Sequence, residues 1–282
     1  MAVETTTFSN NSADTWFRDI MFDCVLCPRA CHVNRLAGQT GYCGQTAELM
    51  AARASLHYWE EPCISGTSGS GTVFFSGCNL RCVFCQNHNI ALGKAGRVIA
   101  PEHLAEIFLQ LQEQGANNIN LVTPTHFLPQ IVIALEQAKQ QGLHLPIVYN
   151  TGSYESPEAL RHLEGLVDIY LPDLKYFSPE LSTAYSHAPD YFETACAAIS
   201  EMYRQVGDSV IDEDTGLMQH GMIVRHLLLP GQTKDSKKIL RYLHETYGDH
   251  IYISIMNQYT PLPQVADIEV PVSYTHLTLP TT

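Results

Sequence analysis

Six apolar segments of strand length recur along the chain and alternate with stretches of helical periodicity. The segments are residues 72–76, 118–122, 146–149, 167–171, 222–229 and 251–256. After the first of them, Leu104, Ile107, Phe108 and Leu111 recur at the spacing of one helix face. Apolar strands that alternate with amphipathic helices form a parallel sheet covered by those helices, with right-handed crossovers. The pattern therefore predicts an α/β fold, a partial (β/α)6 barrel, with a flat doubly wound sheet as the alternative.

Three other stretches are less regular. Residues 178–206 have helical character, and we expect a break around Pro189, which cannot continue a helix. Residues 207–221 are polar and predict an excursion from the barrel. Residues 47–58 fit a strand or a short helix equally well.

Three cysteines directly follow the first apolar segment. Cys78, Cys82 and Cys85 have the spacing C-x3-C-x2-C. Reactive sites of parallel α/β folds lie at the C-terminal strand ends, where this loop is expected. A [4Fe–4S] cluster normally takes four cysteines, so three leave one iron open, as a catalytic metal site leaves a position for substrate. A structural zinc site with His88 as fourth ligand is the alternative reading.

A second cysteine group precedes the barrel. Cys24, Cys27, Cys31 and Cys43 have the spacing C-x2-C-x3-C-x11-C, with glycine-rich turns between them. Four thiolates brought together in this way can hold a second metal site. Thiolates suit iron–sulfur clusters and zinc alike, so both remain open, as does a set of four unligated thiols.

Composition restricts the setting of the protein. The formal net charge is −13, from 16 basic and 29 acidic side chains, and no run of Lys or Arg occurs, so no nucleic-acid partner is expected. The polar N-terminus lacks the apolar core of a signal peptide, and no stretch of about 18 apolar residues predicts a membrane span. Nine cysteines without a secretion signal then indicate a reducing compartment, so we expect a cytoplasmic protein. Cys63 and Cys196 have no close cysteine neighbour and are expected to be buried structural thiols.

The chain is expected to have three parts. Residues 1–62 form a small N-terminal cysteine-rich extension, and residues 63–270 form the partial barrel. Residues 271–282 resemble a translated sequencing-adapter read-through rather than a natural terminus. On that reading the tail is non-native and the barrel is truncated at its C-terminal end, and a natural floppy terminus is the alternative.

The loop from Gly77 to Asn87, including Phe84 just before the third cysteine, resembles the signature of the radical S-adenosylmethionine (SAM) superfamily. The resemblance implies an enzyme that binds a [4Fe–4S] cluster and SAM. It implies reductive cleavage of SAM to a 5′-deoxyadenosyl radical, which abstracts hydrogen from a protein, peptide or small-molecule substrate. It also implies a low-potential electron donor, a ferredoxin or flavodoxin.

Over roughly residues 72–257 the chain is most similar to proteins related to the pyruvate formate-lyase activating enzyme. The first cysteine group and residues 85–87 and 123–127 resemble an uncharacterised branch with an N-terminal cysteine-rich extension, which is similar to a family that accompanies the Memo-like proteins. True activating enzymes carry Gly-Gly-Glu at the end of the second strand, and Thr125 is the nearest polar replacement here. This departure puts glycyl-radical activation in doubt but not SAM binding.

The resemblance also implies cofactor-binding residues at the strand ends. Asn150 and Ser153 match a segment beside the SAM ribose and a monovalent cation site, although they could equally be turn formers. Lys175 is implied to pair with the SAM carboxylate, with Asp173 orienting it or holding a cation. Asn79 and Phe84 in the cysteine loop complete the expected SAM contacts together with Thr125, and no catalytic residue is assigned.

Arg225 lies inside the apolar fifth segment. A buried arginine needs an anionic partner, so we expect it to face a carboxylate of SAM or substrate, or to form a structural pair with Asp173 or with an acid of another strand. His226 should point to the opposite face and pack against a helix. Asn257, Gln258 and Tyr259 end the sixth segment and could contact adenine or substrate.

Two function classes compete with a radical SAM oxidoreductase. A two-cluster electron-transfer protein would explain both cysteine groups without SAM, but it would not need an open iron or polar strand ends. A zinc-stapled interaction module would be colourless and free of iron. A narrower form of the enzyme hypothesis is activation of a partner glycyl radical enzyme.

Overall fold

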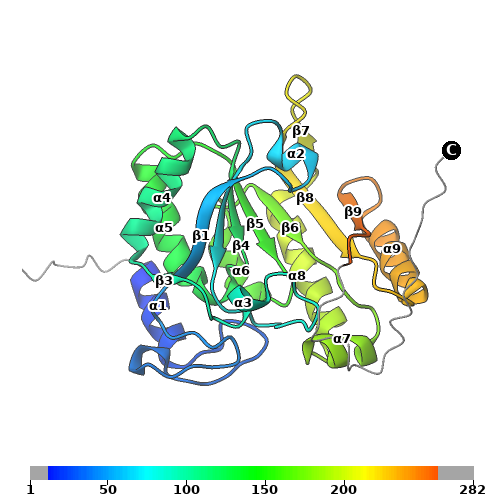
Figure 1. Ribbon diagram of the computed structural model, residues 1–282, viewed down its shortest axis with the longest axis horizontal. Coiled ribbons are helices and arrows are strands. Elements are labelled where there is room, and N and C mark those ends of the chain that lie inside the picture. The colour runs from blue at the N-terminus through cyan, green and yellow to red at the C-terminus, as the bar shows by residue number, and fades with distance from the viewer. Residues whose placement is uncertain (1–11, 260–282) are drawn as a thin grey trace, which may run out of the picture.

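The computed structural model describes residues 12–259 (Figure 1). Six strands run parallel in the order β2, β4, β5, β6, β8, β9. Their bounds are Ser70–Phe75, Ile119–Val122, Ile147–Thr151, Ile169–Pro172, Met218–Leu227 and Tyr252–Met256. These are the six predicted segments, so the α/β prediction is confirmed. Within the described residues the sheet is not closed, and the barrel is partial.

Two further strands extend the sheet beyond β2. β1 (Met50–His57) pairs antiparallel with β2, and β3 (Arg97–Val98) pairs antiparallel with β1. The ambiguous stretch at residues 47–58 is therefore mainly a strand, because its backbone completes the edge of β2. The end of the proposed extension, residues 1–62, thus contributes a strand to the sheet.

The polar excursion at residues 207–221 is a hairpin. β7 (Val210–Ile211) pairs antiparallel with the start of β8, so β8 begins earlier than the sequence predicts. The carboxylate of Asp212 accepts hydrogen bonds from the backbone N–H and the hydroxyl of Thr215, and both are 2.7 Å long. This local turn, completed by Gly216 at φ +69°, folds the chain back onto itself.

Helices pack on the sheet and at its ends (Figure 1). The α-helices are α1 (Ser12–Phe22), α2 (Pro62–Ser65), α3 (His88–Ala91), α4 (Pro101–Glu113), α5 (Leu128–Gln140), α6 (Pro157–Leu160), α7 (Pro179–Ser186), α8 (Tyr191–Val206) and α9 (Thr233–Tyr247). Short 3-10 turns are η1 (Arg35–Ala37), η2 (Thr125–Phe127) and η3 (Arg161–Leu163). The predicted break near Pro189 is confirmed, since His187 adopts φ +50° between α7 and α8.

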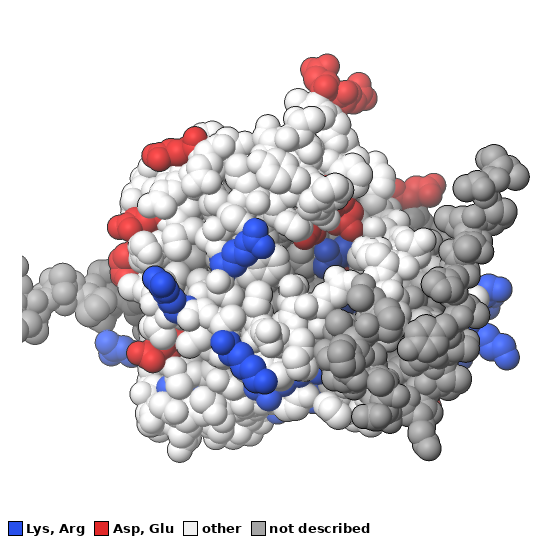
Figure 2. Space-filling model, in the orientation of Figure 1, with Lys and Arg blue, Asp and Glu red and all other residues white. Residues whose placement is uncertain are grey.

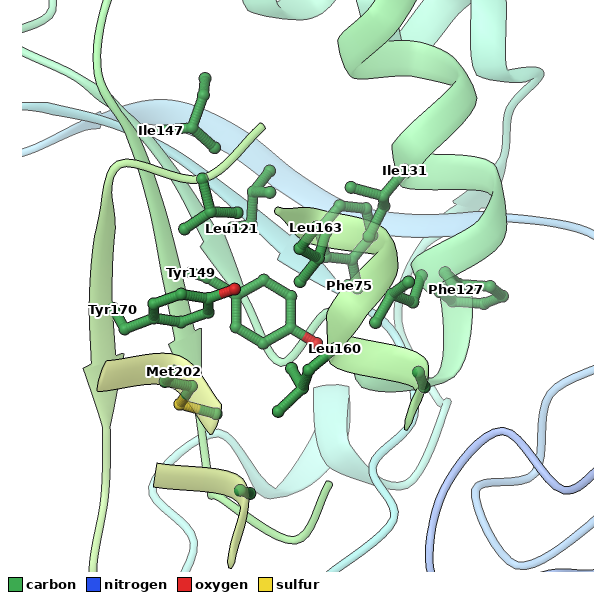
Figure 3. Close-up of a cluster of buried hydrophobic side chains, with 14 of the residues drawn as sticks. Phe75, Leu121, Phe127, Ile131, Ile147, Tyr149, Leu160, Leu163, Tyr170 and Met202 are labelled. Carbon is green, nitrogen blue, oxygen red and sulfur yellow. The ribbon is translucent and has the colours of Figure 1, made fainter. Parts of the chain in front are cut away.

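The main core lies between the sheet and the helices. Tyr149 and Tyr170 are fully buried from neighbouring strands, with ring centroids 5.7 Å apart, and they pack with Leu160 and Met202 (Figure 3). Successive residues of a strand point to opposite faces, so Val148 and Asn150 face the concave side.

A smaller apolar cluster fills the concave side. Val148, Ile169 and Ile223 meet Ile64 of α2 there. Asn118 donates to the Ile64 carbonyl at 2.7 Å and holds α2 over this cluster. The polar residues further along the same strands, including Asn150, are therefore left facing the same side at the C-terminal strand ends.

On the face shown in Figure 2, Lys and Arg side chains are scattered and form no continuous basic patch. Across residues 12–259, no helix combines the length and the apolar character that crossing a bilayer requires.

Candidate functional site

The three cysteines of the first motif lie in a compact loop after β2. The backbone turns at Gly77, with φ +87°, and the loop is held to α7 by a 2.9 Å hydrogen bond from the Val83 N–H to the Tyr185 carbonyl. The Leu80 N–H donates to Cys78 Sγ at 3.4 Å, and the Ser186 hydroxyl donates to Cys82 Sγ at 3.0 Å. Donors that point at sulfur stabilise thiolates, which are the form that binds iron.

The thiols of this loop are buried, and burial governs their acidity. The pKa of Cys85 is raised to about 12, mainly by burial and then by the neighbouring Cys78 and Cys82, whereas Lys175 acts in the opposite direction. Burial also raises the pKa of Cys78. Thiols with such high pKa values become thiolates when a metal supplies positive charge. The donor set therefore fits a cluster with three cysteine ligands.

Aromatic rings surround Phe84, the residue before the third cysteine. Its ring lies 5.9 Å from that of Tyr185 and 6.3 Å from those of Tyr176 and Tyr259, measured between centroids. These contacts join the cysteine loop to α7 and to the end of the described chain. Phe84 is thus part of an apolar wall that limits water near Cys82 and Cys85.

A charged cluster forms on the concave side, where the predicted SAM residues meet. Arg225 Nε donates to Asp173 at 2.8 Å, and Arg225 Nη2 donates to the side-chain carbonyl oxygen of Asn150 at 2.7 Å. Lys175 pairs with the other oxygen of Asp173. The structural pair between Arg225 and Asp173, expected as one of two readings, is therefore present.

Glu60 is a member of this cluster that sequence reasoning missed. Its carboxylate accepts from Arg225 NH1 at 3.2 Å, and its side chain is 11% exposed. Glu60 precedes β2 in the chain and lies in a Trp59-Glu60-Glu61 stretch with no motif. Nothing in the sequence indicates that one of these two acids turns inward.

This charged cluster contains two basic side chains, Arg225 and Lys175, and two acidic ones, Asp173 and Glu60. Each charge shifts the pKa of its neighbours. Burial alone would raise the pKa of Asp173, but Arg225 and Lys175 hold it below its ordinary value. Burial alone would lower the pKa of Lys175, but Asp173 raises it above its ordinary value. Lys175 therefore stays protonated. Its positive charge lowers the pKa of Cys78 and Cys85, and Cys82 in turn raises the pKa of Lys175.

A second polar group lies on the helix side of the strand ends. Glu155 is fully buried and accepts hydrogen bonds from Thr125 at 2.6 Å, Thr151 at 2.5 Å and Tyr149 at 3.3 Å. Burial raises the pKa of Glu155 to about 7, and these three donors lower it only in part. Thr125, the expected replacement for the activase glutamate, thus contacts a carboxylate that comes from the loop after β5.

The remaining predicted residues differ in how free they are. The Ser153 hydroxyl is buried and has no hydrogen-bond partner within residues 12–259, and its φ of +64° marks a strained turn. Asn79, by contrast, donates to the Tyr154 carbonyl at 2.6 Å. His226 is buried and contacts the Leu174 carbonyl at 2.7 Å. Ser153 is therefore available for a ligand contact, whereas the Asn79 amide already has a partner.

The four cysteines of the first group come together around one narrow pocket. Cys24, Cys27, Cys31 and Cys43 all line it, together with Arg29, Arg35 and His126. Burial raises the pKa of Cys27 to about 12 and also raises that of Cys43. Cys63 lies on α2 and Cys196 on α8, and both are only partly buried, so the prediction that they are buried thiols is wrong.

Parts of the chain are similar in sequence to known proteins. The sequence model of the Radical SAM superfamily matches residues 72–243. An uncharacterised protein of Methanocaldococcus jannaschii is 28% identical over 254 residues, which cover 86% of this chain and 68% of that protein. The pyruvate formate-lyase-activating enzyme of Clostridium pasteurianum is 29% identical over 121 residues, or 40% of this chain and 48% of that enzyme.

Two solved structures are also similar. Methylornithine synthase matches with a TM-score of 0.45 at 16% identity, covering 66% of this chain and 52% of that one. A structure of anSMEcpe with bound AdoMet matches with a TM-score of 0.42 at 14% identity, covering 66% and 50%. The chain thus spans about half the length of these structures. The matched region contains the three-cysteine loop, most of β2, and all of β4, β5, β6 and β8. The chain therefore belongs to the radical SAM superfamily.

Proposed function

We propose that this protein is a radical SAM enzyme whose [4Fe–4S] cluster is held by Cys78, Cys82 and Cys85 and whose SAM lies on the concave side of the sheet. When bound there, the cluster would supply the one-electron chemistry that cleaves SAM to methionine and a hydrogen-abstracting 5′-deoxyadenosyl radical. The observation that carries the proposal is the position of Lys175, which is largely buried, is paired with Asp173 and lowers the pKa of Cys78 and Cys85 in the cysteine loop.

The chain's own residues bind and orient SAM. Lys175 is a cation that can pair with the SAM carboxylate, and Asp173 holds its ammonium group in place. Arg225 and Asn150 fix each other at the next strand ends. Ser153, whose buried hydroxyl has no hydrogen-bond partner within residues 12–259, would donate a hydrogen bond to the ribose. Phe84 and the tyrosines around it exclude water from the reacting atoms.

The substrate is proposed by class. Hydrogen abstraction from a protein, peptide or small molecule makes the enzyme an oxidoreductase, and activation of a glycyl radical enzyme is the narrower form. The partial similarity to the Clostridium pasteurianum activating enzyme supports the narrower form, whereas Thr125 in place of the activase glutamate argues against it.

The electron donor and the location follow from the chemistry. We propose a ferredoxin or flavodoxin as the one-electron donor. All nine cysteines lie in the described chain and none of them is in a disulfide, which supports a reducing compartment such as the cytoplasm.

Cleavage of SAM tests the proposal directly. Anaerobically reconstituted protein is mixed with SAM and dithionite, and 5′-deoxyadenosine is quantified. Cys82→Ala should abolish the product, whereas Cys196→Ala, a matched cysteine on α8 outside both motifs, should not. Product from Cys82→Ala at the native level, or none from native protein with an intact cluster, would refute radical SAM activity and favour an electron-transfer protein.

A further inference from the structure

The N-terminal cysteine pocket carries positive charge that no described acid balances. Arg35 is 1% exposed, and its Nε and NH2 both donate to the Thr46 carbonyl, at 3.2 and 2.7 Å. Its NH1 has no partner within residues 12–259, and no carboxylate there forms an ion pair with it. A guanidinium stays charged, and a buried cation is costly without an anion. Four thiolates around a metal would supply that negative charge.

A second unpartnered group also lines the pocket. His126 is 2% exposed, and its Nε2 lies 2.6 Å from the Ser76 carbonyl, so Nε2 carries the proton. Its Nδ1, which is then a lone pair, has no hydrogen-bond partner in the described chain. Buried polar atoms without partners are rare, and this one belongs to a side chain that lines the pocket of the four cysteines.

Backbone donors point at the cysteine sulfurs. The Tyr42 N–H donates to Cys31 Sγ at 3.3 Å, and the N–H groups of Arg29 and Gln45 donate to Cys27 and Cys43. Such donors stabilise metal-bound thiolates and tune the potential of iron–sulfur clusters. The donors around these sulfurs thus suit a negatively charged metal–thiolate group, although within residues 12–259 no three Cys, His, Asp or Glu side chains are already arranged around one metal position.

The pocket also adjoins the radical SAM loop. Arg29, between Cys27 and Cys31, donates to the Asn79 carbonyl at 2.8 Å and to the Ser186 carbonyl at 2.9 Å. Ser186 is the residue whose hydroxyl donates to Cys82. The guanidinium of Arg29 also lies 3.9 Å from the centre of the Tyr42 ring, and the Tyr42 hydroxyl donates to the Leu80 carbonyl at 3.4 Å. Single side chains therefore span the two cysteine sites.

We infer that Cys24, Cys27, Cys31 and Cys43 hold a second iron–sulfur cluster that exchanges electrons with the cluster of the radical SAM loop. A redox-active group uses this adjacency, whereas a zinc ion would not. One electron enters from an external low-potential one-electron reductant, reduces the second cluster and passes to the first, and no bond forms or breaks in the transfer. The relay, but not the second cluster itself, rests on the proposed function.

Metal analysis of a variant without the first site tests the second site. In the triple variant Cys78→Ala, Cys82→Ala, Cys85→Ala, anaerobic reconstitution should leave about four irons and four sulfides per chain, with a cluster signal in electron paramagnetic resonance. The single variant Cys27→Ser should lose that iron and keep the rest, and Cys63→Ala should lose none. Zinc in place of iron, or no metal in the triple variant, would overturn the second cluster.

A single turnover tests the relay. Protein with both clusters reduced is freed of reductant and mixed with SAM, and 5′-deoxyadenosine is measured per chain. Two linked clusters should yield about twice the product of Cys27→Ser, because each reduced cluster stores one electron. Equal yields would overturn the relay. No product from either protein would instead refute the proposed function, and the iron content of the triple variant would still decide the second cluster.

Discussion

Gly77 lies against the backbone of Cys43, so the two cysteine motifs touch through their main chains. A methyl group at Gly77 would sit 2.8 Å from the Cys43 carbonyl oxygen and 2.6 Å from Cγ of Gln45. Gly77 also has φ +87°, a conformation that residues with a Cβ adopt only under strain. Only glycine allows the residue before Cys78 to approach the N-terminal extension this closely.

Gly77→Ala should therefore disturb both cysteine sites. Backbone strain of about 1–2 kcal/mol adds to overpacking of about 1–3 kcal/mol. Gly115→Ala is the matched control, since Gly115 has φ +84° but nothing within 4 Å of the added methyl. Chemical unfolding and iron content should show a larger loss for Gly77→Ala than for Gly115→Ala. Equal losses would mean that strain alone matters and that the contact with Cys43 does not.

Asp173→Asn should destabilise the protein strongly. Asp173 balances Arg225 and Lys175 on a side chain that is 14% exposed, and removal of one partner of a buried pair costs about 3–5 kcal/mol. The free energy of unfolding, measured by urea titration, should fall by that amount. Glu164→Gln, which breaks an exposed pair with Arg204, should change it little. A small change in the free energy of unfolding for Asp173→Asn would show that water reaches the charged side chains of Arg225 and Lys175.

Lys175→Gln should weaken SAM binding, and the variant should still bind the iron–sulfur cluster. A charge-assisted hydrogen bond contributes about 1.5–3 kcal/mol, so the Kd for SAM should rise roughly 10- to 100-fold. Equilibrium dialysis of cluster-loaded protein measures the Kd. Lys238→Gln is the control, because Lys238 lies over the Phe177 ring at 4.7 Å, away from the cysteines. An unchanged Kd would remove Lys175 from the SAM site.

Glu155→Gln should flatten the pH dependence of stability. Burial raises the pKa of Glu155 from 4.5 to about 7, so the folded protein keeps the proton that the unfolded chain releases. The contribution of Glu155 to the free energy of unfolding is fully present below about pH 4.5 and is lost as the pH rises to about 7. Above about pH 7 it no longer changes with pH. The shift corresponds to roughly 3 kcal/mol.

Glutamine is neutral throughout, and its carbonyl can still accept from Thr125 and Thr151. The difference in unfolding free energy between native protein and Glu155→Gln should therefore favour the variant increasingly between pH 5 and 7. Parallel curves for the two proteins would contradict a raised pKa. Glu158→Gln, at the exposed start of α6, is the control.

Ser186→Ala should make the radical SAM cluster harder to reduce. The Ser186 hydroxyl donates to Cys82 Sγ, and such a bond stabilises the more negative, reduced state. A bond of about 1 kcal/mol corresponds to roughly 40 mV, so the potential should become more negative by that amount. Ser182→Ala is the control on the same helix, since its hydroxyl donates to the Pro179 carbonyl instead. A redox titration followed by electron paramagnetic resonance measures both, and equal potentials would mean that the bond is absent.

Much of the fold could be predicted because its signals are local. Each of the six parallel strands is an apolar run, and the helix between β2 and β4 shows its apolar face at positions such as Leu104 and Phe108. The stretch at residues 47–58 could not be assigned, since its pairing with β2 is a long-range property. The suspected tail at residues 271–282 lies outside the described residues, and the proposed division into extension and barrel stays a prediction.

The sequence by itself indicated the radical SAM family, because Cys78, Cys82 and Cys85, the proposed cluster ligands, lie at short spacing in one loop. Only the tertiary structure decided which polar and charged side chains of distant segments contact one another. Glu60 reaches Arg225 and Glu155 reaches Thr125 across strands, and Arg29 joins the two cysteine sites. The physical reason is that a motif needs only short-range spacing, whereas a buried charge finds its partner through packing between segments that are far apart in the chain.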